Sequence, residues 1–309
     1  MGKIAVHVAL ATLLLLSTVY LLQAEDSTLP KPAVAPAVVV QPQGLLATRP
    51  LGGREYFFRN HDVVPMGAGV IQLPILMYHY IRTPPSMRVD PLGYRLSVAP
   101  DVFEAQMDWL YFHHYHPVTF EQVRAYFAGR APLPSKPLVI TLDDGYSDLY
   151  TAAFPILQAH GFSAVAYIVS GFVDQPRYVT HAQVLQMDRA GIEIASHTVD
   201  HANMGTTNVG YITYQIVQSK RWLEGLVGHP VTDFAYPSGR YSAVAVQLLS
   251  QYGYDTAVIE DGSSLHSRAN RYLWGRVRVG GGESMQDFVT NLGPSMPSVT
   301  ISSLNVTAS

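Results

Sequence analysis

The chain has 309 residues, of which 48% are hydrophobic and 14% are charged, and its formal net charge is -3. This length supports one sizeable folded domain, and the charge gives no basic surface for binding nucleic acid. The sequence contains no cysteine, which excludes a thiol nucleophile, a cysteine-ligated metal and a disulfide framework.

The N-terminal segment is strongly apolar. Lys3 precedes an apolar run over residues 4–22, and the run ends at Gln23-Ala24-Glu25-Asp26. A positive start, a long apolar stretch and a small residue at Ala24 predict that residues 1–24 are a signal peptide. The run is also nearly long enough to remain as a membrane anchor. Either alternative makes the protein extracytoplasmic, secreted or held at the membrane through this segment alone.

Composition divides the rest of the chain into three parts. Residues 25–70 are rich in Pro, Ala and Val, which predicts an extended linker. Residues 71–293 carry the periodic apolar patterns of a folded domain. Residues 294–309 are rich in Ser, Thr and Pro and are predicted to form a flexible tail.

Within the domain, apolar runs of strand length alternate with segments of helical periodicity. The predicted strands span residues 73–78, 138–142, 163–169, 192–195, 232–236, 256–259 and 276–279. The predicted helices span residues 100–113, 119–129, 147–161, 180–191, 211–226 and 242–252. About seven alternations imply parallel strands joined by crossover helices, which at this length predicts a closed or nearly closed (β/α) barrel.

Three of these helices begin at recognisable capping signals. Thr119-x-x-Gln122 and Thr180-x-x-Gln183 each match a capping box. Ser147, which follows the turn at Gly145, is predicted to cap the helix that runs to residue 161. These signals predict where each of the three helices starts.

Two adjacent carboxylates, Asp143 and Asp144, follow the apolar strand that begins at Leu138. Gly145 comes next and allows a sharp turn. The pair therefore lies at the carboxyl end of a buried strand, where α/β folds place their chemistry. Two close carboxylates repel each other unless a cation lies between them. A surface Asp-Asp-Gly turn is the alternative interpretation.

His197 and His201 follow another predicted strand. Their spacing of four residues would place them on one face of a helical turn. Two imidazoles joined by a carboxylate from elsewhere form a common three-ligand zinc site with an open fourth position. Two surface histidines at the start of a helix are the alternative.

The two stretches together resemble a known family. Thr141-Leu-Asp-Asp-Gly145 and Ser196-His-Thr-Val-Asp-His201 are similar, in order and in placement, to the first two motifs of the polysaccharide deacetylases, the family 4 carbohydrate esterases. The resemblance covers roughly residues 73–292. It implies a distorted (β/α) barrel, in agreement with the alternation of strands and helices.

The resemblance also implies roles for the motif residues. Asp143 corresponds to the catalytic base of the family. Asp144, His197 and His201 correspond to the ligands of one divalent metal ion, for which Zn²⁺ is the expected identity.

The third family motif, Arg-x-Pro-Tyr-Gly, is only partly matched by Ala235-Tyr-Pro-Ser-Gly239. The resemblance implies that the backbone N–H of Ser238 binds the oxyanion, a role that survives the change of side chain. The arginine that orients the base is absent at Ala235. Arg276, in Trp274-Gly-Arg-Val-Arg-Val279, is the predicted replacement. An arginine on a surface strand is the alternative for this position.

The last family motif, an apolar run ending in histidine near the C-terminus, is also absent. Leu73-Pro-Ile-Leu-Met-Tyr-His79 instead stands at the beginning of the domain. This order resembles the poly-N-acetylglucosamine deacetylase branch, in which the last strand is permuted to the front. It implies that His79 is the catalytic acid. His266 is the alternative, although it lies in a Ser-rich segment with no predicted strand before it.

These features predict a metal-dependent enzyme that removes acetyl groups from N-acetylated sugars of an envelope or extracellular polysaccharide and releases acetate. One alternative is O-deacetylation, of xylan for example, by the same residues. A catalytically weak glycan-binding barrel is the other alternative, suggested by the change at Ala235. The expected partner is an acetylated polysaccharide, and the sequence does not predict an oligomeric state.

Overall fold

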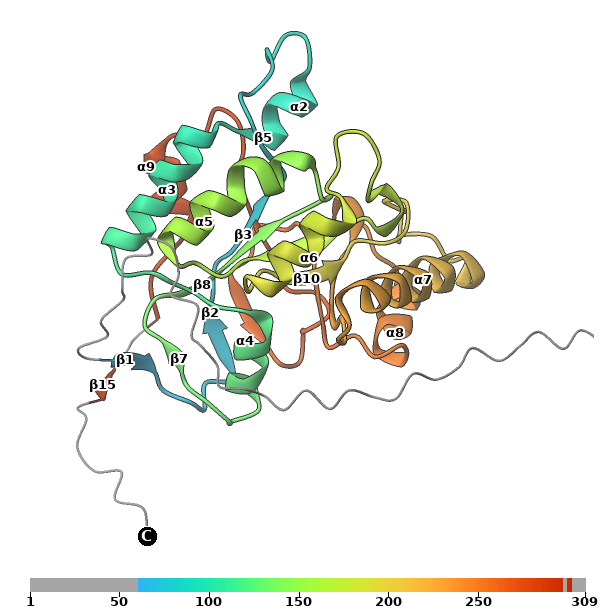
Figure 1. Cartoon of the computed structure of the whole chain (residues 1–309). Coiled ribbons are helices and arrows are strands. Elements are labelled where there is room, and N and C mark those ends of the chain that lie inside the picture. Colours follow the sequence, from blue (N-terminus) through green and yellow to red (C-terminus); the bar gives the residue numbers. More distant parts are fainter. Residues whose placement is uncertain (1–60, 297–298, 302–309) are drawn as a thin grey trace, which may run out of the picture. The chain divides into compact units, whose positions relative to one another are not determined.

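A curled sheet of seven parallel strands organises the protein (Figure 1). The computed structural model describes residues 61–296 and 299–301. The strand order is β12-β11-β10-β9-β8-β3-β14. These strands are β3 (Ile75–Tyr78), β8 (Pro137–Leu142), β9 (Val165–Ile168), β10 (Glu193–Ser196), β11 (Asp233–Ala235), β12 (Thr256–Val258) and β14 (Val277–Arg278). The predicted distorted (β/α) barrel of about seven strands is confirmed.

The strands are apolar because both faces of the sheet are buried. All six residues of β8 are buried. Leu138 and Ile140 pack into the core between the sheet and its outer helices. Val139 packs with Tyr167 and Ala195 into a second core on the concave face. This alternation places every second strand residue inside the curl.

The strand that comes first in sequence lies between two later ones. In β3, Leu76 pairs with Ile140 of β8 on one side and with Val277 of β14 on the other. On the far side of the curl, β12 meets the residues before β14 through one isolated bridge between Val258 and Trp274. The sheet is therefore a half-barrel with an irregular seam, and the strand that ends before His79 is central to it.

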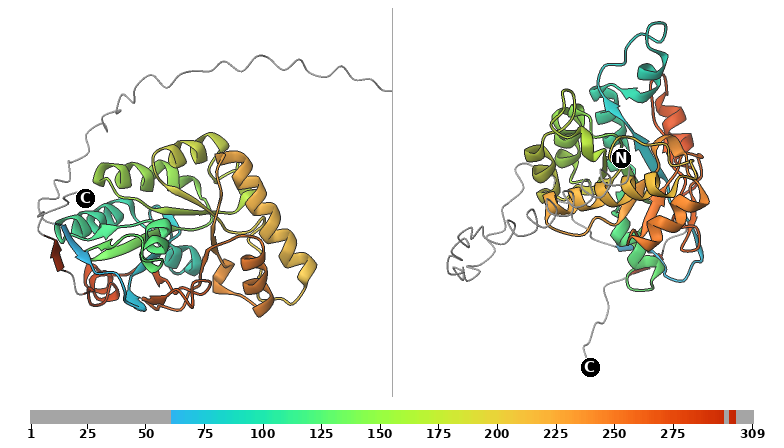
Figure 2. Two further views of the ribbon diagram at one scale, coloured as in Figure 1. Left: turned by 90° about the horizontal axis from the view of Figure 1, so that it is seen from below. Right: turned by 90° about the vertical axis from the view of Figure 1, so that its right-hand side faces the viewer.

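Several helices cover the outer side of the sheet. Helices α3, α5, α6 and α7 lie along it (Figure 1), and α7 lies beside α8 (Figure 2). The helices are α2 (Pro91–Leu96), α3 (Pro100–Phe112), α4 (Phe120–Phe127), α5 (Phe154–His160), α6 (His181–Arg189), α7 (Val209–Val227), α8 (Ala243–Gln251) and α9 (Met285–Asn291). The capping boxes at Thr119 and Thr180 are both present. No helix among the described residues is long and apolar enough to cross a membrane.

The predicted cap at Ser147 is wrong. A π-helical turn, Leu149–Ala153, precedes α5, and its N-cap residue Asp148 makes no capping hydrogen bond through its side chain. The Ser147 N–H donates to the Arg177 carbonyl at 2.8 Å instead. Backbone contacts with a neighbouring loop thus determine the conformation of this turn, and a local capping pattern could not reveal them.

Strand pairing extends beyond the predicted domain at both ends. Strand β1 (His61–Val64) lies in the range predicted as linker, and β15 (Val299–Ile301) lies in the range predicted as tail. They pair antiparallel with each other, and β1 also pairs with β7 (Leu133–Pro134). The segment predicted as signal peptide or anchor, residues 1–24, lies outside the described residues.

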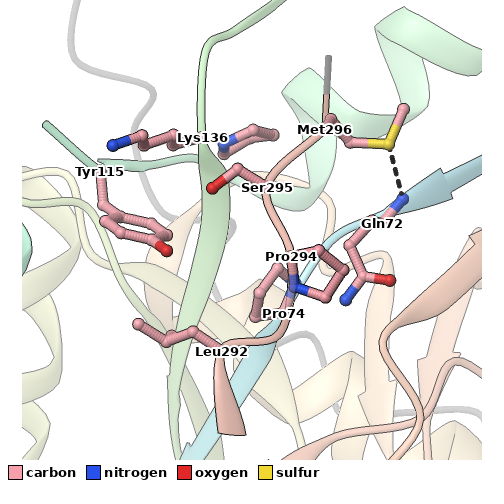
Figure 3. A pocket seen from close by; sticks show the side chains of 9 residues that line it. Gln72, Pro74, Tyr115, Lys136, Leu292, Pro294, Ser295 and Met296 are labelled. Atoms are coloured by element: carbon pink, nitrogen blue, oxygen red, sulfur yellow. Dashed lines mark hydrogen bonds between the residues drawn. The ribbon is translucent and has the colours of Figure 1, made fainter. Parts of the chain in front are cut away.

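The chain before β15 packs against the start of the barrel (Figure 3). Pro294 and Met296 line a narrow pocket together with Gln72 and Pro74. The Gln72 N–H donates to the Met296 sulfur at 3.1 Å. The first residues of the predicted tail are therefore in contact with the domain.

His266 lies in a strand that the sequence did not indicate. Strand β13 (Leu265–Ser267) pairs antiparallel with β2 (Val70–Gln72). The expectation of no strand at this position is therefore wrong, because the pairing joins residues almost two hundred positions apart. The His266 ring is fully buried, 5.8 Å from the Trp274 ring, and neither ring nitrogen has a hydrogen-bond partner. Burial lowers the pKa of His266 from 6.5 to about 4.

We predict that His266→Leu makes the protein less sensitive to acid. Because the pKa of His266 is lowered in the folded state, the unfolded chain takes up the proton first, and stability falls as the pH drops from about 6.5 towards 4. The difference between these pKa values corresponds to about 3 kcal/mol. Urea denaturation at pH 7 and pH 4 should show a smaller loss of unfolding free energy in the variant. A substitution of the exposed His113, His113→Gln, serves as the control. Equal losses in wild type and His266→Leu would contradict the prediction.

Candidate active site

Strand alternation carries polar side chains to one end of the concave face. On β8, Val139 and Thr141 point into the curl, and Asp143 follows two residues later. On β10, Ala195 is followed in the same way by His197. Since the strands are parallel, their carboxyl ends meet at one edge of the sheet. Asp143 and His197 are each only 1% exposed at this edge.

Asp144 departs from the strand pattern through its backbone. Its φ of 72° is followed by a φ of 75° at Gly145. Two left-handed residues in succession reverse the chain directly after Asp143. Glycine is needed at the second position because a Cβ there would be strained by the φ and would lie 3.1 Å from the Ile168 side chain. Left-handed backbone in a residue other than glycine is often found at functional sites.

His197 and His201 are brought together by turns, so the prediction that they share a helix face is wrong. Thr198 and His201 both have positive φ, at 69° and 60°. The Thr198 hydroxyl accepts a hydrogen bond from the Ala202 N–H at 2.9 Å and thereby stabilises the turn. His197 Nδ1 contacts the Ala235 carbonyl at 2.8 Å. This contact makes Nδ1 the donor and leaves Nε2 as the nitrogen that faces the site.

The side chains of Asp144, His197 and His201 form a cluster that fits a divalent cation. The Nε2 atoms of the two histidines each lie 3.4 Å from Asp144 Oδ1, and the three ligand atoms lie within 4.8 Å of one another. Asp144 Oδ1 is buried and has no hydrogen-bond donor. One carboxylate oxygen and two imidazole nitrogens are a common donor set for zinc with an open position.

The protonation of Asp144 agrees with this fit. Burial by itself raises the pKa of Asp144, but the contact with His197 and the charges of the surrounding histidines outweigh burial and lower it overall. The carboxylate is therefore ionised at neutral pH, which metal binding requires.

Arg276 contacts the other carboxylate, as the sequence suggested. Its Nη1 and Nη2 donate to the two oxygens of Asp143 at 2.6 and 2.7 Å. Burial by itself raises the pKa of Asp143, but the Arg276 guanidinium outweighs it and holds the pKa below its ordinary value. The arginine missing at Ala235 thus has a spatial counterpart that comes from the residue before β14.

His79 directly follows β3, beside the end of β8. It is 7% exposed, and its Nδ1 atom is buried with no hydrogen-bond partner. Burial lowers the pKa of His79, and the nearby charges of Asp143 and Asp144 partly oppose that change. Asp143 and Asp144 are therefore both close enough to His79 to affect its protonation.

Ser238 lies in the short turn Pro237–Gly239 that follows β11. Its φ is 54°, and Gly239 follows with a φ of 64°. A Cβ on Gly239 would lie 3.0 Å from the Glu260 backbone nitrogen, so the turn packs closely against the segment after β12. The distinctive feature of this turn is therefore its left-handed backbone at Ser238 and Gly239, not the serine side chain.

Sequence reasoning missed a group of aromatic side chains beside Asp144. The Tyr146 ring stacks on Tyr80 with 3.7 Å between centroids and on Tyr178 at 5.2 Å. Burial raises the pKa of Tyr146, and the negative charge of Asp144 raises it further. The position of Tyr146 directly after the Asp-Asp-Gly stretch was the available signal. The pairing with Tyr80 and Tyr178 required the fold.

A second polar cluster lies at the opposite, amino-terminal ends of the strands. Arg124 Nη1 contacts the buried Asp233 at 2.5 Å, and burial together with the Asp233 charge raises the pKa of Glu193. The Thr256 hydroxyl also donates to Asp233. Polar groups at this end of a β/α barrel usually contribute to stability rather than to catalysis.

Comparisons with known proteins agree with this geometry. The family model described as polysaccharide deacetylase matches residues 130–257. A putative polysaccharide deacetylase of Bacillus subtilis is 29% identical over 217 residues, which cover 70% of this chain and 75% of that protein. The poly-beta-1,6-N-acetyl-D-glucosamine N-deacetylase of Escherichia coli K12 is 28% identical over 242 residues. That match covers 64% of this chain but 36% of the Escherichia coli protein.

Solved structures show the same architecture. The Streptococcus pyogenes deacetylase PplD, in complex with acetate, superposes with a TM-score of 0.66 at 26% identity, covering 72% of this chain and 99% of PplD. IcaB from Ammonifex degensii has a TM-score of 0.64 at 22% identity, covering 74% of this chain and 99% of IcaB, and supports the fold alone. With these matches, the motifs and the curled parallel sheet, the chain carries a polysaccharide deacetylase domain.

Proposed function

We propose that this protein hydrolyses acetyl groups from N-acetylated sugars of an envelope or extracellular polysaccharide and releases acetate. The observation that carries the proposal is the convergence of two arrangements at one end of the sheet. One is the buried Asp143–Arg276 pair, and the other is the cluster of Asp144, His197 and His201. The similarity to the Escherichia coli poly-beta-1,6-N-acetyl-D-glucosamine N-deacetylase supports an N-acetylated substrate.

The same proposal assigns one divalent metal ion to Asp144, His197 and His201. A mixed set of one oxygen and two nitrogen donors favours Zn²⁺. A zinc ion supplies Lewis acidity, which polarises an acyl carbonyl and lowers the pKa of water. The Nδ1 contact of His197 with the Ala235 carbonyl orients the imidazole for this role.

Asp143 acts as the general base in this proposal. The carboxylate is ionised because Arg276 lowers its pKa, and each oxygen keeps a free lone pair beside its hydrogen bond to the guanidinium. It can therefore accept a proton from the attacking water. The backbone N–H of Ser238 would donate to the oxyanion that forms on the acetyl carbonyl.

His79 acts as the general acid. Hydrolysis of an amide expels an amine, which is a poor leaving group unless a proton is delivered to its nitrogen. Histidine suits this step because its pKa lies near neutrality. Burial lowers the pKa of His79 overall, and the negative charges of Asp143 and Asp144 partly oppose that change by favouring the protonated ring.

The proposal places the reaction outside the cytoplasm, with residues 1–24 as signal peptide or anchor and the polysaccharide as the partner. A glycan-binding barrel without turnover was suggested by the missing arginine at Ala235. The direct contact of Arg276 with Asp143 supports turnover over that alternative.

The function is tested by acetate release from purified, zinc-loaded protein. The substrates are poly-N-acetylglucosamine, chitin oligomers, peptidoglycan and acetyl-xylan, and we expect acetate from the N-acetylated glycans. His201→Ala should lose both zinc and acetate release, because a three-ligand site does not tolerate the loss of one ligand. Acetate from acetyl-xylan alone, or from none of the glycans, would contradict the proposal. An unchanged zinc content in His201→Ala, measured by elemental analysis, would contradict the ligand assignment.

The acid role of His79 is tested by His79→Ala. This variant should retain zinc and lower kcat by roughly 10²–10⁴, the usual contribution of a positioned acid. His266→Leu is the matched control and should keep wild-type kcat at pH 7, because His266 is buried beside Trp274 and outside the cluster. Normal kcat in His79→Ala together with a large loss in His266→Leu would show that the acid is misassigned.

A further inference from the structure

Thr141 has a buried hydroxyl that contacts both β3 and the arginine that precedes β14. Its side chain is fully buried on the concave face of β8. The hydroxyl donates to the Leu76 carbonyl at 2.8 Å and accepts from Arg276 Nη1 at 3.1 Å. A hydroxyl has one hydrogen and two lone pairs, so both contacts can be made at the same time.

The two partners of Thr141 lead to the groups proposed as acid and base. Leu76 lies on β3, three residues before His79, and Arg276 contacts Asp143. Thr141 itself lies two residues before Asp143 on the same face of the strand. One hydroxyl therefore connects the strand that ends at the acid, the strand that ends at the base and the arginine that orients the base.

The Arg276 guanidinium depends on few partners for its orientation. Nη1 donates to both Asp143 and Thr141, Nη2 donates to Asp143, and Nε approaches the Ile259 carbonyl at 3.4 Å. The Tyr167 ring lies 5.4 Å away. Thr141 thus supplies the short side-chain contact that does not come from Asp143 itself. Removing the Thr141 hydroxyl would leave an Arg276 N–H without that partner. A buried N–H without a partner is costly, so the guanidinium would tend to reorient.

We propose that Thr141 is a positioning residue for deacetylation. Its hydroxyl fixes the position of the Arg276 guanidinium relative to β3, the strand that ends before His79. Through Arg276 it also fixes the position of the Asp143 carboxylate relative to His79. The inference rests on the proposed function, because the relative position of Asp143 and His79 matters only if both act on one substrate. A displacement of about 1 Å in such a group can lower the rate by roughly 10².

The test compares Thr141→Val, which keeps the shape but removes the hydroxyl, with Thr141→Ser, which keeps the hydroxyl. We expect Thr141→Val to lower kcat roughly 10- to 100-fold, with little change in KM and no change in zinc content. Thr141→Ser should recover most of the lost kcat. Thr256→Val is the matched control, because it removes another buried threonine hydroxyl that contacts Asp233 at the opposite end of the sheet. It should leave kcat unchanged even if the melting temperature falls.

A double-mutant cycle distinguishes positioning from a general structural effect. If Thr141 acts through Arg276, adding Thr141→Val to Arg276→Met should cost little further kcat, whereas independent effects multiply. The inference would be overturned if the kcat losses of the two substitutions multiply in the double variant, or if Thr141→Val keeps wild-type kcat. Acetate release by the wild-type protein would still support the proposed function in either case. If the double variant does not fold, the recovery in Thr141→Ser decides the question. Absence of acetate release by the wild type would overturn both proposals.

Discussion

The structure depends on the burial of one arginine inside the curled sheet. Arg276 and Asp143 are each 1% exposed, and they form a two-point ion pair at 2.6 and 2.7 Å. An unpaired charge in this position would cost several kcal/mol, so the strands that bear the two residues must meet in one arrangement. Strand β3 lies between β8 and β14, and Arg276 reaches across its concave side. The placement of the early strand is therefore tied to the ion pair.

This arrangement gives each titratable group a different environment at the same edge of the sheet. Arg276 keeps Asp143 ionised by lowering its pKa, and the histidine cluster does the same for Asp144. Asp144 differs because its left-handed backbone turns it towards His197 and His201. Two adjacent carboxylates can thus take different roles, one paired with a guanidinium and one available to a metal ion.

Local patterns in the sequence predicted the features that depend on neighbouring residues. The strand alternation, the two capping boxes and the placement of Asp143 and Asp144 at a strand end all follow from such patterns. The features that depend on long-range pairing were missed, including β13, which pairs with β2, and the joining of β1 to β15. His197 and His201 were expected to meet for the wrong reason, because positive φ angles rather than a helix bring them together. The sequence suggests Arg276 as the replacement for the arginine missing at Ala235, but its hydrogen bond with Thr141 depends on the fold.

In the proposed mechanism Arg276 needs its planar, two-point contact with Asp143 as well as its positive charge. Lysine keeps the charge but cannot bind both carboxylate oxygens in the same plane. The most direct measurement is therefore the rate of acetate release by zinc-loaded Arg276→Lys at saturating N-acetylated substrate. We expect a loss of roughly 10² in kcat at unchanged zinc content, because the base would be misplaced. A kcat within about twofold of wild type would contradict it.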